Sequence, residues 1–320
     1  MTSKNQTSTL SPKRESLTPA SVEDFHRLRA RDVTSTEVAA LFGLSPYVTP
    51  FELWHRKRAG DVAEIESNDR MKWGTRLQDS IAAGLAEDQG WTVRRRPQYE
   101  RLPDRRLGAS FDFTIVGGPQ GDGLLEVKNV DSLVLRDEWI VEEDSVEAPP
   151  HIEMQVQHQL LVSGLPYAYI GALVGGNRAV LIRREPAPEI VANILVRAED
   201  FWQSVETGKE PKPDFSRDSA FIAKLYRDVK PGRVIDVAED AEIAELVATY
   251  KASKTARDEH EAKRGEVKAR LLMKIGDAEK AIGNGWSISA GAVKASRVEA
   301  YDRAAYRDFR VNSKKPKKED

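Results

Sequence analysis

The sequence predicts an α/β protein with a central mixed β-sheet flanked by helices, followed by a charged helical extension. Strand-like apolar runs and segments of helical periodicity alternate through the first two thirds of the chain. The apolar fraction of 40% over 320 residues is enough for a large core. Beyond about residue 215 charged residues dominate. We therefore expect a disordered tail (1–18), a core domain (19–215) and a helical extension with a basic tail (216–320).

Composition excludes several classes of function. The chain carries 49 basic and 51 acidic residues, so a nucleic-acid site must be a local patch. It has no cysteine, which excludes disulfide scaffolds, thiolate nucleophiles and iron–sulfur clusters. It also lacks an apolar run that would serve as a signal sequence or span a membrane. We therefore expect a cytoplasmic protein with no membrane partner.

The elements of the core follow in order. Residues 1–18 are rich in Ser, Thr and Lys and are expected to be disordered. An amphipathic segment opens at Ser21, and a short helix begins near Thr49-Pro50 and stops at Gly60. Further helices are expected at 69–90, 151–162 and 188–207. Strands are expected at 91–99, 106–116, 123–130, 167–176 and 178–185.

The extension has a different pattern. From Ala238 to Ile282, apolar residues occur near both ends at helical spacing, with a highly charged stretch between them. This pattern predicts a long, partly exposed helix or a helical hairpin, and it is too interrupted for a coiled coil. The final residues, SKKPKKED, read as a basic, solvated tail.

The predicted strand GLLEVKNV carries two charged residues. Side chains two apart on a strand share a face, so Glu126 and Lys128 point the same way and Leu125 and Val127 point to the core. The turn-rich segment GGPQGDG joins this strand to a predicted strand that contains Asp112, so a hairpin brings Asp112 near Glu126.

Two adjacent carboxylates repel, and a divalent cation between them relieves that repulsion. Oxygen ligands without cysteine favour Mg²⁺ or Mn²⁺. A neighbouring lysine can orient a metal-bound water, so the implied reaction is phosphodiester hydrolysis. The alternative is a surface hairpin in which Glu126 and Lys128 belong to an ordinary cross-strand salt-bridge network.

A polar arc marks the predicted helix HIEMQVQHQLLVSG. His151, Gln155, His158 and Gln159 fall within one arc, and an apolar stripe lies on another. The polar arc either faces the acidic site or is a solvated helix face. The two histidines are unsuited as metal ligands, because an i, i+7 pair has no third partner at suitable spacing.

These segments resemble a known family. LGASFDFTIV, GLLEVKN and MQVQHQLLVSG are similar to the PD-(D/E)XK nuclease motif and glutamine-bearing helix of the YqaJ-like viral recombinases, the lambda-exonuclease type. FHRLRARDVTSTEVAALFGLSPYVTPFELWHRKRAG resembles the N-terminal block of that family, and WGTRLQDSIAAGL resembles its second helix. The resemblance covers about residues 21–210 in the family's order. It implies a PD-(D/E)XK restriction-endonuclease-like core.

The resemblance also implies an activity. The family suggests a Mg²⁺-dependent 5′-to-3′ exonuclease, with Mn²⁺ able to substitute, that acts on linear double-stranded DNA ends. Its 3′ overhangs would serve phage homologous recombination by strand annealing, in the cytoplasm of a bacterial host. The implied partners are DNA ends, a single-strand-annealing protein and, in a ring-shaped trimer, further copies of the chain. The alternatives are an inactive or weak DNA-end-binding protein of the same fold and a PD-(D/E)XK endonuclease.

Site residues follow from the resemblance position by position. Asp112 and Glu126, with the carbonyl of Val127, would bind the metal. Lys128 would position the attacking water, and Gln155 would support the lysine and the site geometry.

Further residues carry the resemblance beyond the metal site. Arg29 and Thr36 match positions that hold the 5′-phosphate of the DNA end, where a guanidinium and a hydroxyl are suitable donors. Gln78 stands where the family has a glutamate, so activity is expected to be weaker unless Asp79 replaces that charge. Asp104 is a second candidate for added charge. Five arginines are candidates for a DNA track: Arg94, Arg95, Arg96, Arg105 and Arg106.

Overall fold

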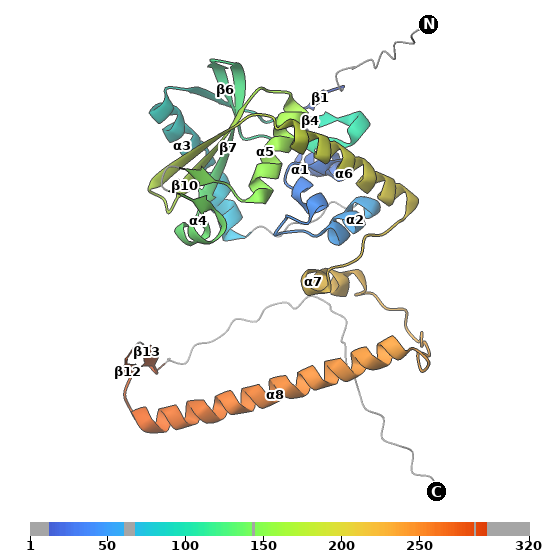
Figure 1. Ribbon diagram of the computed structural model, residues 1–320, viewed down its shortest axis with the longest axis vertical. Coiled ribbons are helices and arrows are strands. Elements are labelled where there is room, and N and C mark those ends of the chain that lie inside the picture. The colour runs from blue at the N-terminus through green and yellow to red at the C-terminus, as the bar shows by residue number, and fades with distance from the viewer. Residues whose placement is uncertain (1–12, 61–67, 143–144, 285, 293–320) are drawn as a thin grey trace. The chain divides into compact units, whose positions relative to one another are not determined.

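The computed structural model describes residues 13–60, 68–142, 145–284 and 286–292 (Figure 1). The chain divides into two compact units, Met1–Phe221 and Ile222–Asp320. Within the described ranges, none of the helices is both long and apolar enough to cross a membrane. The basic tail SKKPKKED and residues 1–12 of the expected N-terminal tail lie outside those ranges.

A five-stranded mixed sheet, in the order β11-β10-β7-β6-β3, forms the centre of the first unit (Figure 1). Its strands are β3 (Thr92–Arg95), β6 (Phe113–Gly118), β7 (Gly121–Val130), β10 (Ala168–Val174) and β11 (Arg178–Arg184). β7 and β10 pair in parallel and the other pairs are antiparallel. The predicted mixed sheet is thus confirmed.

A second, four-stranded sheet has the order β1-β4-β5-β2. Its strands are β1 (Glu15–Leu17), β2 (Val33–Thr34), β4 (Tyr99–Leu102) and β5 (Leu107–Ala109). The prediction of one strand over residues 106–116 is therefore wrong. β5 pairs with β4 in this sheet and β6 pairs with β7 in the central sheet, so the chain crosses between sheets at residues 110–112.

The expectation of a disordered tail is wrong for residues 13–18. β1 pairs with β4 in antiparallel register, from Glu15 opposite Arg101 to Leu17 opposite Tyr99. Arg14 also donates from Nε to the carbonyl of Val162 at 3.0 Å. This edge strand is held by backbone hydrogen bonds and polar contacts, which a prediction based on apolar content does not detect.

Helices cover both faces of the central sheet. The predicted helices are confirmed, and the helical elements of this unit are α1 (Val22–Arg31), η1 (Val38–Phe42), α2 (Pro50–Ala59), α3 (Asp69–Gln89), η2 (Pro103–Arg105), α4 (Ser132–Glu138), α5 (Pro150–Ser163) and α6 (Pro188–Thr207). A small hairpin of β8 (Ile140–Val141) and β9 (Val146–Glu147) precedes α5. Ser21 and Thr49 cap the N-termini of α1 and α2, and Gly60 and Gly90 end α2 and α3 in the left-handed conformation.

The two faces of β7 pack in different clusters. Leu125 and Val127 join Ile81 and Leu85 of α3. Leu124 lies on the other face, in the main cluster that contains the apolar stripe of α5. Since strand side chains alternate, Glu126 and Lys128 share that second face with Leu124 and point toward α5.

After α7 (Phe215–Leu225), the second unit contains α8 (Ala241–Ile275), the long orange helix of Figure 1. Of the two forms expected for this region, the single long helix is observed. An antiparallel hairpin of β12 (Lys280–Gly283) and β13 (Trp286–Ser289) follows it. The helical pattern expected from Ala238 to Ile282 is therefore wrong beyond Ile275, where this hairpin follows the helix.

Candidate active site

The hairpin of β6 and β7 brings the two predicted carboxylates together. Phe113 pairs with Leu125, which places the preceding Asp112 level with Glu126. Asp112 lies in a bend directly before β6, so the prediction that it lies inside a strand is wrong. Its position follows from the crossing between the two sheets, which leaves its backbone outside the β6 ladder. Asp112 Oδ2 accepts the backbone N–H of Val127 at 2.8 Å, which fixes the carboxylate against β7.

Negative charge at Asp112 is poorly compensated. Burial, followed by the charge of Glu126, raises the pKa of Asp112 to about 7. The Val127 N–H, the charge of Lys128 and a hydrogen bond from Gln78 act in the opposite direction but do not offset the rise. Gln78 thus contacts the site, as expected for a supporting residue.

Glu126, by contrast, is 6% exposed and has donors on both oxygens. Oε1 accepts Lys128 Nζ at 2.7 Å and Gln155 Nε2 at 2.6 Å, and Oε2 accepts Gln159 Nε2 at 2.8 Å. Lys128 Nζ also donates to Gln155 Oε1 at 3.1 Å. Burial alone would lower the pKa of Lys128, but the charge of Glu126 and its hydrogen bond raise it, so the ammonium is retained.

The polar arc of α5 faces this site, so its interpretation as a solvated face is wrong. Gln155, His158 and Gln159 are all buried. Gln159 Nε2 also donates to the carbonyl of Ser110 at 3.1 Å, which ties α5 to the segment before Asp112. The sequence reasoning placed Gln159 on the arc but gave it no role; its spacing of four residues from Gln155 was the available signal.

His158 anchors the helix rather than contributing to the metal site. Its Nε2 lies 3.1 Å from the carbonyl oxygen of Gly108 in β5, and its buried Nδ1 has no hydrogen-bond partner among the described residues. Burial lowers the pKa of His158 to about 4, so the ring is neutral at physiological pH.

The carboxylate pair fits a hard divalent cation. Among the described residues, no three His, Cys, Asp or Glu side chains group as a metal-binding set. An ion here would therefore rely on Asp112, Glu126, the carbonyl of Val127 and water. Mg²⁺ usually keeps several waters and binds one or two carboxylates, so this small set is sufficient. The raised pKa of Asp112 reports the unbalanced negative charge that such an ion would neutralise.

The two residues predicted to hold a phosphate also meet. An Nη of Arg29 in α1 donates to Thr36 Oγ1 at 3.1 Å and to Thr34 Oγ1 at 3.4 Å. Glu37 Oε2 accepts the hydroxyl of Thr34 at 2.8 Å and pairs with Lys57 Nζ at 2.8 Å. Thr34, Glu37 and Lys57 were missed, because only the folded chain brings α1, η1 and α2 together. They surround Arg29 with hydroxyl groups and a Glu37–Lys57 ion pair.

One exposed aromatic near the site was also missed. Tyr47, in the loop before α2, is 79% exposed, and its ring lies edge-on to His151 of α5 with 5.7 Å between centroids. Its phenol is close enough to Lys128 to influence the pKa of that ammonium.

Two acidic candidates lie away from the carboxylate pair. Asp79 bonds Arg95 Nε at 2.6 Å and its side chain is 64% exposed, so it does not replace a glutamate at position 78. Asp104 is exposed in η2, and nothing in the described part of the chain joins its side chain to the site.

Four of the five track arginines are paired with acids. Their partners, in chain order from Arg95, are Asp79, Glu100, Glu199 and Glu206. Arg94, on β3, is exposed and has no ion pair in the described ranges. Most of these guanidinium groups therefore already have a carboxylate neighbour, which a phosphate would have to displace.

A mixed sheet that sets an aspartate opposite a Glu-x-Lys strand, covered by helices on both faces, defines a PD-(D/E)XK nuclease-type core. The model of the YqaJ-like viral recombinase domain family matches residues 24–166. A Bacillus subtilis (strain 168) protein described as uncharacterized protein YqaJ is 30% identical over 257 residues, covering 78% of this chain and 77% of that protein. The chain belongs to the YqaJ-like viral recombinase family, as the resemblance in the sequence indicated.

Solved structures with a similar course of the chain include an alkaline exonuclease, LHK-Exo, from Laribacter hongkongensis. It is 18% identical, with a TM-score of 0.43, over 63% of this chain and 99% of that one. The complex of LHK-Exo with dAMP is 19% identical, with a TM-score of 0.42 over the same shares of each chain.

Proposed function

We propose that the protein is a metal-dependent exonuclease that digests linear double-stranded DNA from its 5′ ends and leaves 3′ overhangs for recombination by strand annealing. The observation that carries the proposal is the Asp112–Glu126 carboxylate pair, with the ammonium of Lys128 hydrogen-bonded to Glu126. Membership of the YqaJ-like viral recombinase family supports the same reading.

In this proposal the residues of the site either hold the metal, position the attacking water or fix the geometry of the others. Asp112, Glu126 and the carbonyl of Val127 would hold Mg²⁺, which Mn²⁺ could replace. A bound ion would polarise a phosphoryl oxygen and lower the pKa of its water. Lys128 would orient that water and stabilise developing negative charge with its ammonium. Gln155 holds both Glu126 Oε1 and Lys128 Nζ, so it fixes their relative position.

The DNA end would be held at a second place. Arg29 and Thr36 are joined by a 3.1 Å hydrogen bond, and both present donors to an anion such as a 5′-phosphate. The proposed partners are linear duplex ends, a single-strand-annealing protein and further copies of the chain in a ring-shaped trimer. Contacts from exposed arginines to the DNA backbone would be independent of sequence and sensitive to salt.

Gln78 supports one alternative, a weak or inactive DNA-end-binding protein. It donates a hydrogen bond to Asp112 but brings no negative charge to the metal. An endonuclease with the same core is the other alternative, and it predicts cleavage of closed circular DNA.

The test is digestion of 5′-phosphorylated linear duplex and closed circular DNA of the same sequence, with and without Mg²⁺. The wild type should release nucleotides only from the linear DNA and only with the metal. Glu126→Gln and Lys128→Ala should each lower the rate by about 10²-fold or more. Lys209→Ala, an exposed lysine outside the site, is the matched control and should keep full activity.

DNA-end binding distinguishes the exonuclease from the inactive end-binding protein. Lys128→Ala should retain DNA-end binding in a gel-shift assay without metal, because it removes water positioning rather than phosphate contacts. Undiminished turnover in Lys128→Ala would reject the assignment. End binding by the wild type without any metal-stimulated hydrolysis would favour the inactive end-binding protein.

A further inference from the structure

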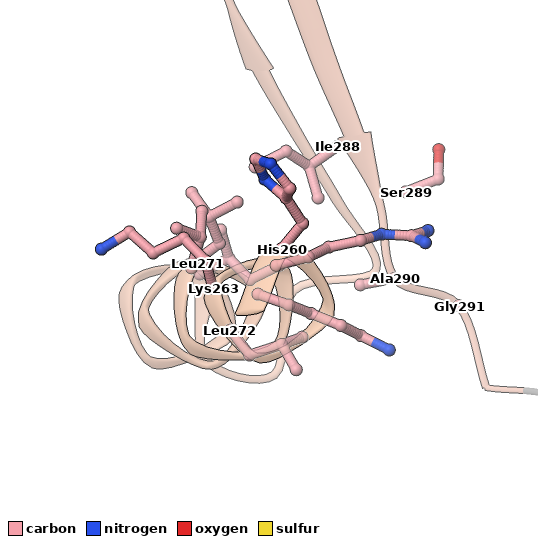
Figure 2. Close-up of a pocket in the computed structure, with 12 residues that line it drawn as sticks. His260, Lys263, Leu271, Leu272, Ile288, Ser289, Ala290 and Gly291 are labelled. Carbon is pink, nitrogen blue, oxygen red and sulfur yellow. The ribbon is translucent and has the colours of Figure 1, made fainter. Parts of the chain in front are cut away.

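The buried polar side chains of the described residues all lie in the first unit. The cavity of about 780 Å³ between α8 and β13, in the second unit, is instead lined mainly by basic and apolar side chains that are exposed or half-buried (Figure 2). Among the buried side chains, Lys57 is the one lysine or arginine in the described part of the chain. A buried ion pair adds little stability compared with apolar residues, so a cation at this position calls for another role.

Lys57 lies in α2, and its ammonium contacts two groups outside that helix. Nζ pairs with Glu37 Oε2 at 2.8 Å and donates to the main-chain carbonyl of Arg29 at 2.9 Å. The side chain of Lys57 is 4% exposed, so a DNA end does not reach the ammonium itself. Any effect of Lys57 on a ligand therefore passes through the residues that it holds.

Glu37 links this lysine to the proposed phosphate site. Besides Lys57, its Oε2 accepts the backbone N–H of Thr34 at 2.9 Å and the hydroxyl of Thr34 at 2.8 Å. Burial would raise the pKa of Glu37, but the charges of Lys57 and Arg29, with hydrogen bonds from Lys57 and Thr34, lower it below its ordinary value. Burial lowers the pKa of Lys57, and the charge of Glu37 opposes that fall. The two charges therefore depend on each other.

The hydroxyl of Thr34 gives this network a direction. A hydroxyl has one proton, and Thr34 donates it to Glu37. Thr34 can therefore only accept from Arg29, whose Nη lies 3.4 Å away, and from Thr36, whose Oγ1 lies 3.3 Å away. Thr34 thus orients these two donors, and Arg29 and Thr36 remain the groups that can donate to an anion.

Arg29 is consequently held at both ends by one ammonium. Lys57 holds its main-chain carbonyl directly, and it holds its guanidinium through Glu37 and Thr34. Lys57 also offsets the negative charge of Glu37, which lies about three hydrogen bonds, or about 8 Å, from an anion on Thr36. At about 8 Å and an effective dielectric constant of about 20, one uncompensated charge lowers the affinity for a monovalent anion about 30-fold.

We propose that Lys57 is a positioning residue for the 5′-phosphate of a DNA end, because it fixes Arg29 and neutralises Glu37. This role rests on the proposed function, since it takes Arg29 and Thr36 to be the groups that meet the phosphate. Lys57 affects the selection of the end and not the cleavage of the bond, so its role can be measured without hydrolysis.

The test compares two duplexes that differ only in a phosphate or a hydroxyl at the 5′ end. Fluorescence anisotropy with the full chain at pH 8, with a chelator to prevent hydrolysis, gives the ratio of the two dissociation constants, which is the phosphate preference. Lys57→Met removes the charge and should lower this preference about tenfold or more, because Glu37 then repels the phosphate. Glu37→Gln removes the repelling charge, so its preference should equal or exceed that of the wild type.

The double variant Glu37→Gln/Lys57→Met separates charge from structure. The amide oxygen at position 37 can still accept from Thr34, and the carbonyl of Arg29 still accepts the N–H of Asp32 at 3.3 Å. Its phosphate preference should return to within about threefold of the wild type. An ion pair with only a structural role would show a similar loss from either single substitution and no recovery in the double variant.

Arg56→Met is the matched control, because it removes the cation of the neighbouring Glu52–Arg56 ion pair in the same helix. It should leave the phosphate preference unchanged. Far-ultraviolet circular dichroism and thermal unfolding should show native helix content in every variant that is compared.

Three results would each overturn the proposal: an unchanged preference in Lys57→Met, a loss in Glu37→Gln, or a preference in the double variant that stays about tenfold or more below that of the wild type. The last two results do not require Lys57→Met to fold. A wild type without any preference for the phosphate would overturn the phosphate site and this role of Lys57 together. A wild type that prefers the phosphate through Lys57 but does not hydrolyse DNA with Mg²⁺ would reject only the exonuclease.

Discussion

Replacing Asp112 with asparagine should inactivate the candidate site and stabilise the fold at the same time. The amide has the shape of the carboxyl group, and its oxygen can still accept the N–H of Val127, which is 2.8 Å from Asp112 Oδ2. The substitution removes the negative charge of Asp112, which burial and the neighbouring Glu126 disfavour. The stability gain should therefore depend on pH.

The size of the gain follows from the two pKa values of Asp112. In the unfolded chain it has its ordinary value of 3.8, and in the native protein it is about 7. The native state thus holds an extra proton between these values, and native stability falls as the pH rises through that window. At about 1.4 kcal/mol per unit, the loss reaches about 4 kcal/mol above pH 7. Asp112→Asn avoids this loss, so its advantage should be near zero at pH 4 and about 4 kcal/mol at pH 8.

Urea unfolding at pH 5 and pH 8, with a chelator present, measures the difference in unfolding free energy between the wild type and Asp112→Asn. Asp88→Asn, an exposed position in α3, is the control and should show no gain at either pH. Mg²⁺ should narrow the gap at pH 8, because it would bind the native wild type and not the variant. An equal gain at both pH values, or a variant less stable than the wild type at pH 8, would refute the electrostatic argument.

Two further predictions concern other parts of the first unit. Arg29→Gln/Thr36→Val should lower the preference for 5′-phosphorylated over 5′-hydroxyl duplex ends by about tenfold or more, because hydrogen bonds to a charged group contribute about 1.5–3 kcal/mol. Digestion of the two substrates in one reaction measures it, and an unchanged preference would contradict the phosphate site. His158→Gln should remove a pH-dependent loss of stability of about 2 kcal/mol between pH 7 and pH 5, because the pKa of His158 is about 4 when native and 6.5 when unfolded. Asp112 causes the opposite pH trend in both the wild type and His158→Gln, so its effect cancels in the comparison. Curves of unfolding free energy against pH that run parallel in the two proteins would contradict this prediction.

The helices were predictable because their signals are local. Ser21 and Thr49 supply N-terminal caps, and Gly60 and Gly90 supply left-handed ends within a few residues of the helices they bound. β1 was missed because its partner β4 lies more than 80 residues away. The break between β5 and β6 was missed because residues 110–112 contain neither Gly nor Pro, and tertiary pairing with two different sheets decides it.

The part of the candidate site that depends on local pattern was also predictable. Strand alternation places Glu126 and Lys128 on one face, and the hairpin turn brings Asp112 to them without any knowledge of the fold. The role of Gln159 depends on how far α5 is rotated against β7, and the cluster around Arg29 depends on three separate elements. The cluster around Arg29 has no signature in the spacing of residues along the chain, and the signal for Gln159 is only its four-residue spacing from Gln155.

The charge balance of the site gives Gln78 a physical meaning. Within the described ranges, Glu126 has three donors on its two oxygens, whereas Asp112 accepts from the Val127 N–H and Gln78. A glutamate at position 78 would add a third carboxylate beside a pair whose repulsion already raises the pKa of Asp112. Glutamine instead donates a hydrogen bond, so it lowers the cost of the metal-free site while offering less negative charge to a cation. We therefore expect a glutamine at position 78 to stabilise the metal-free protein and to lower its affinity for a cation.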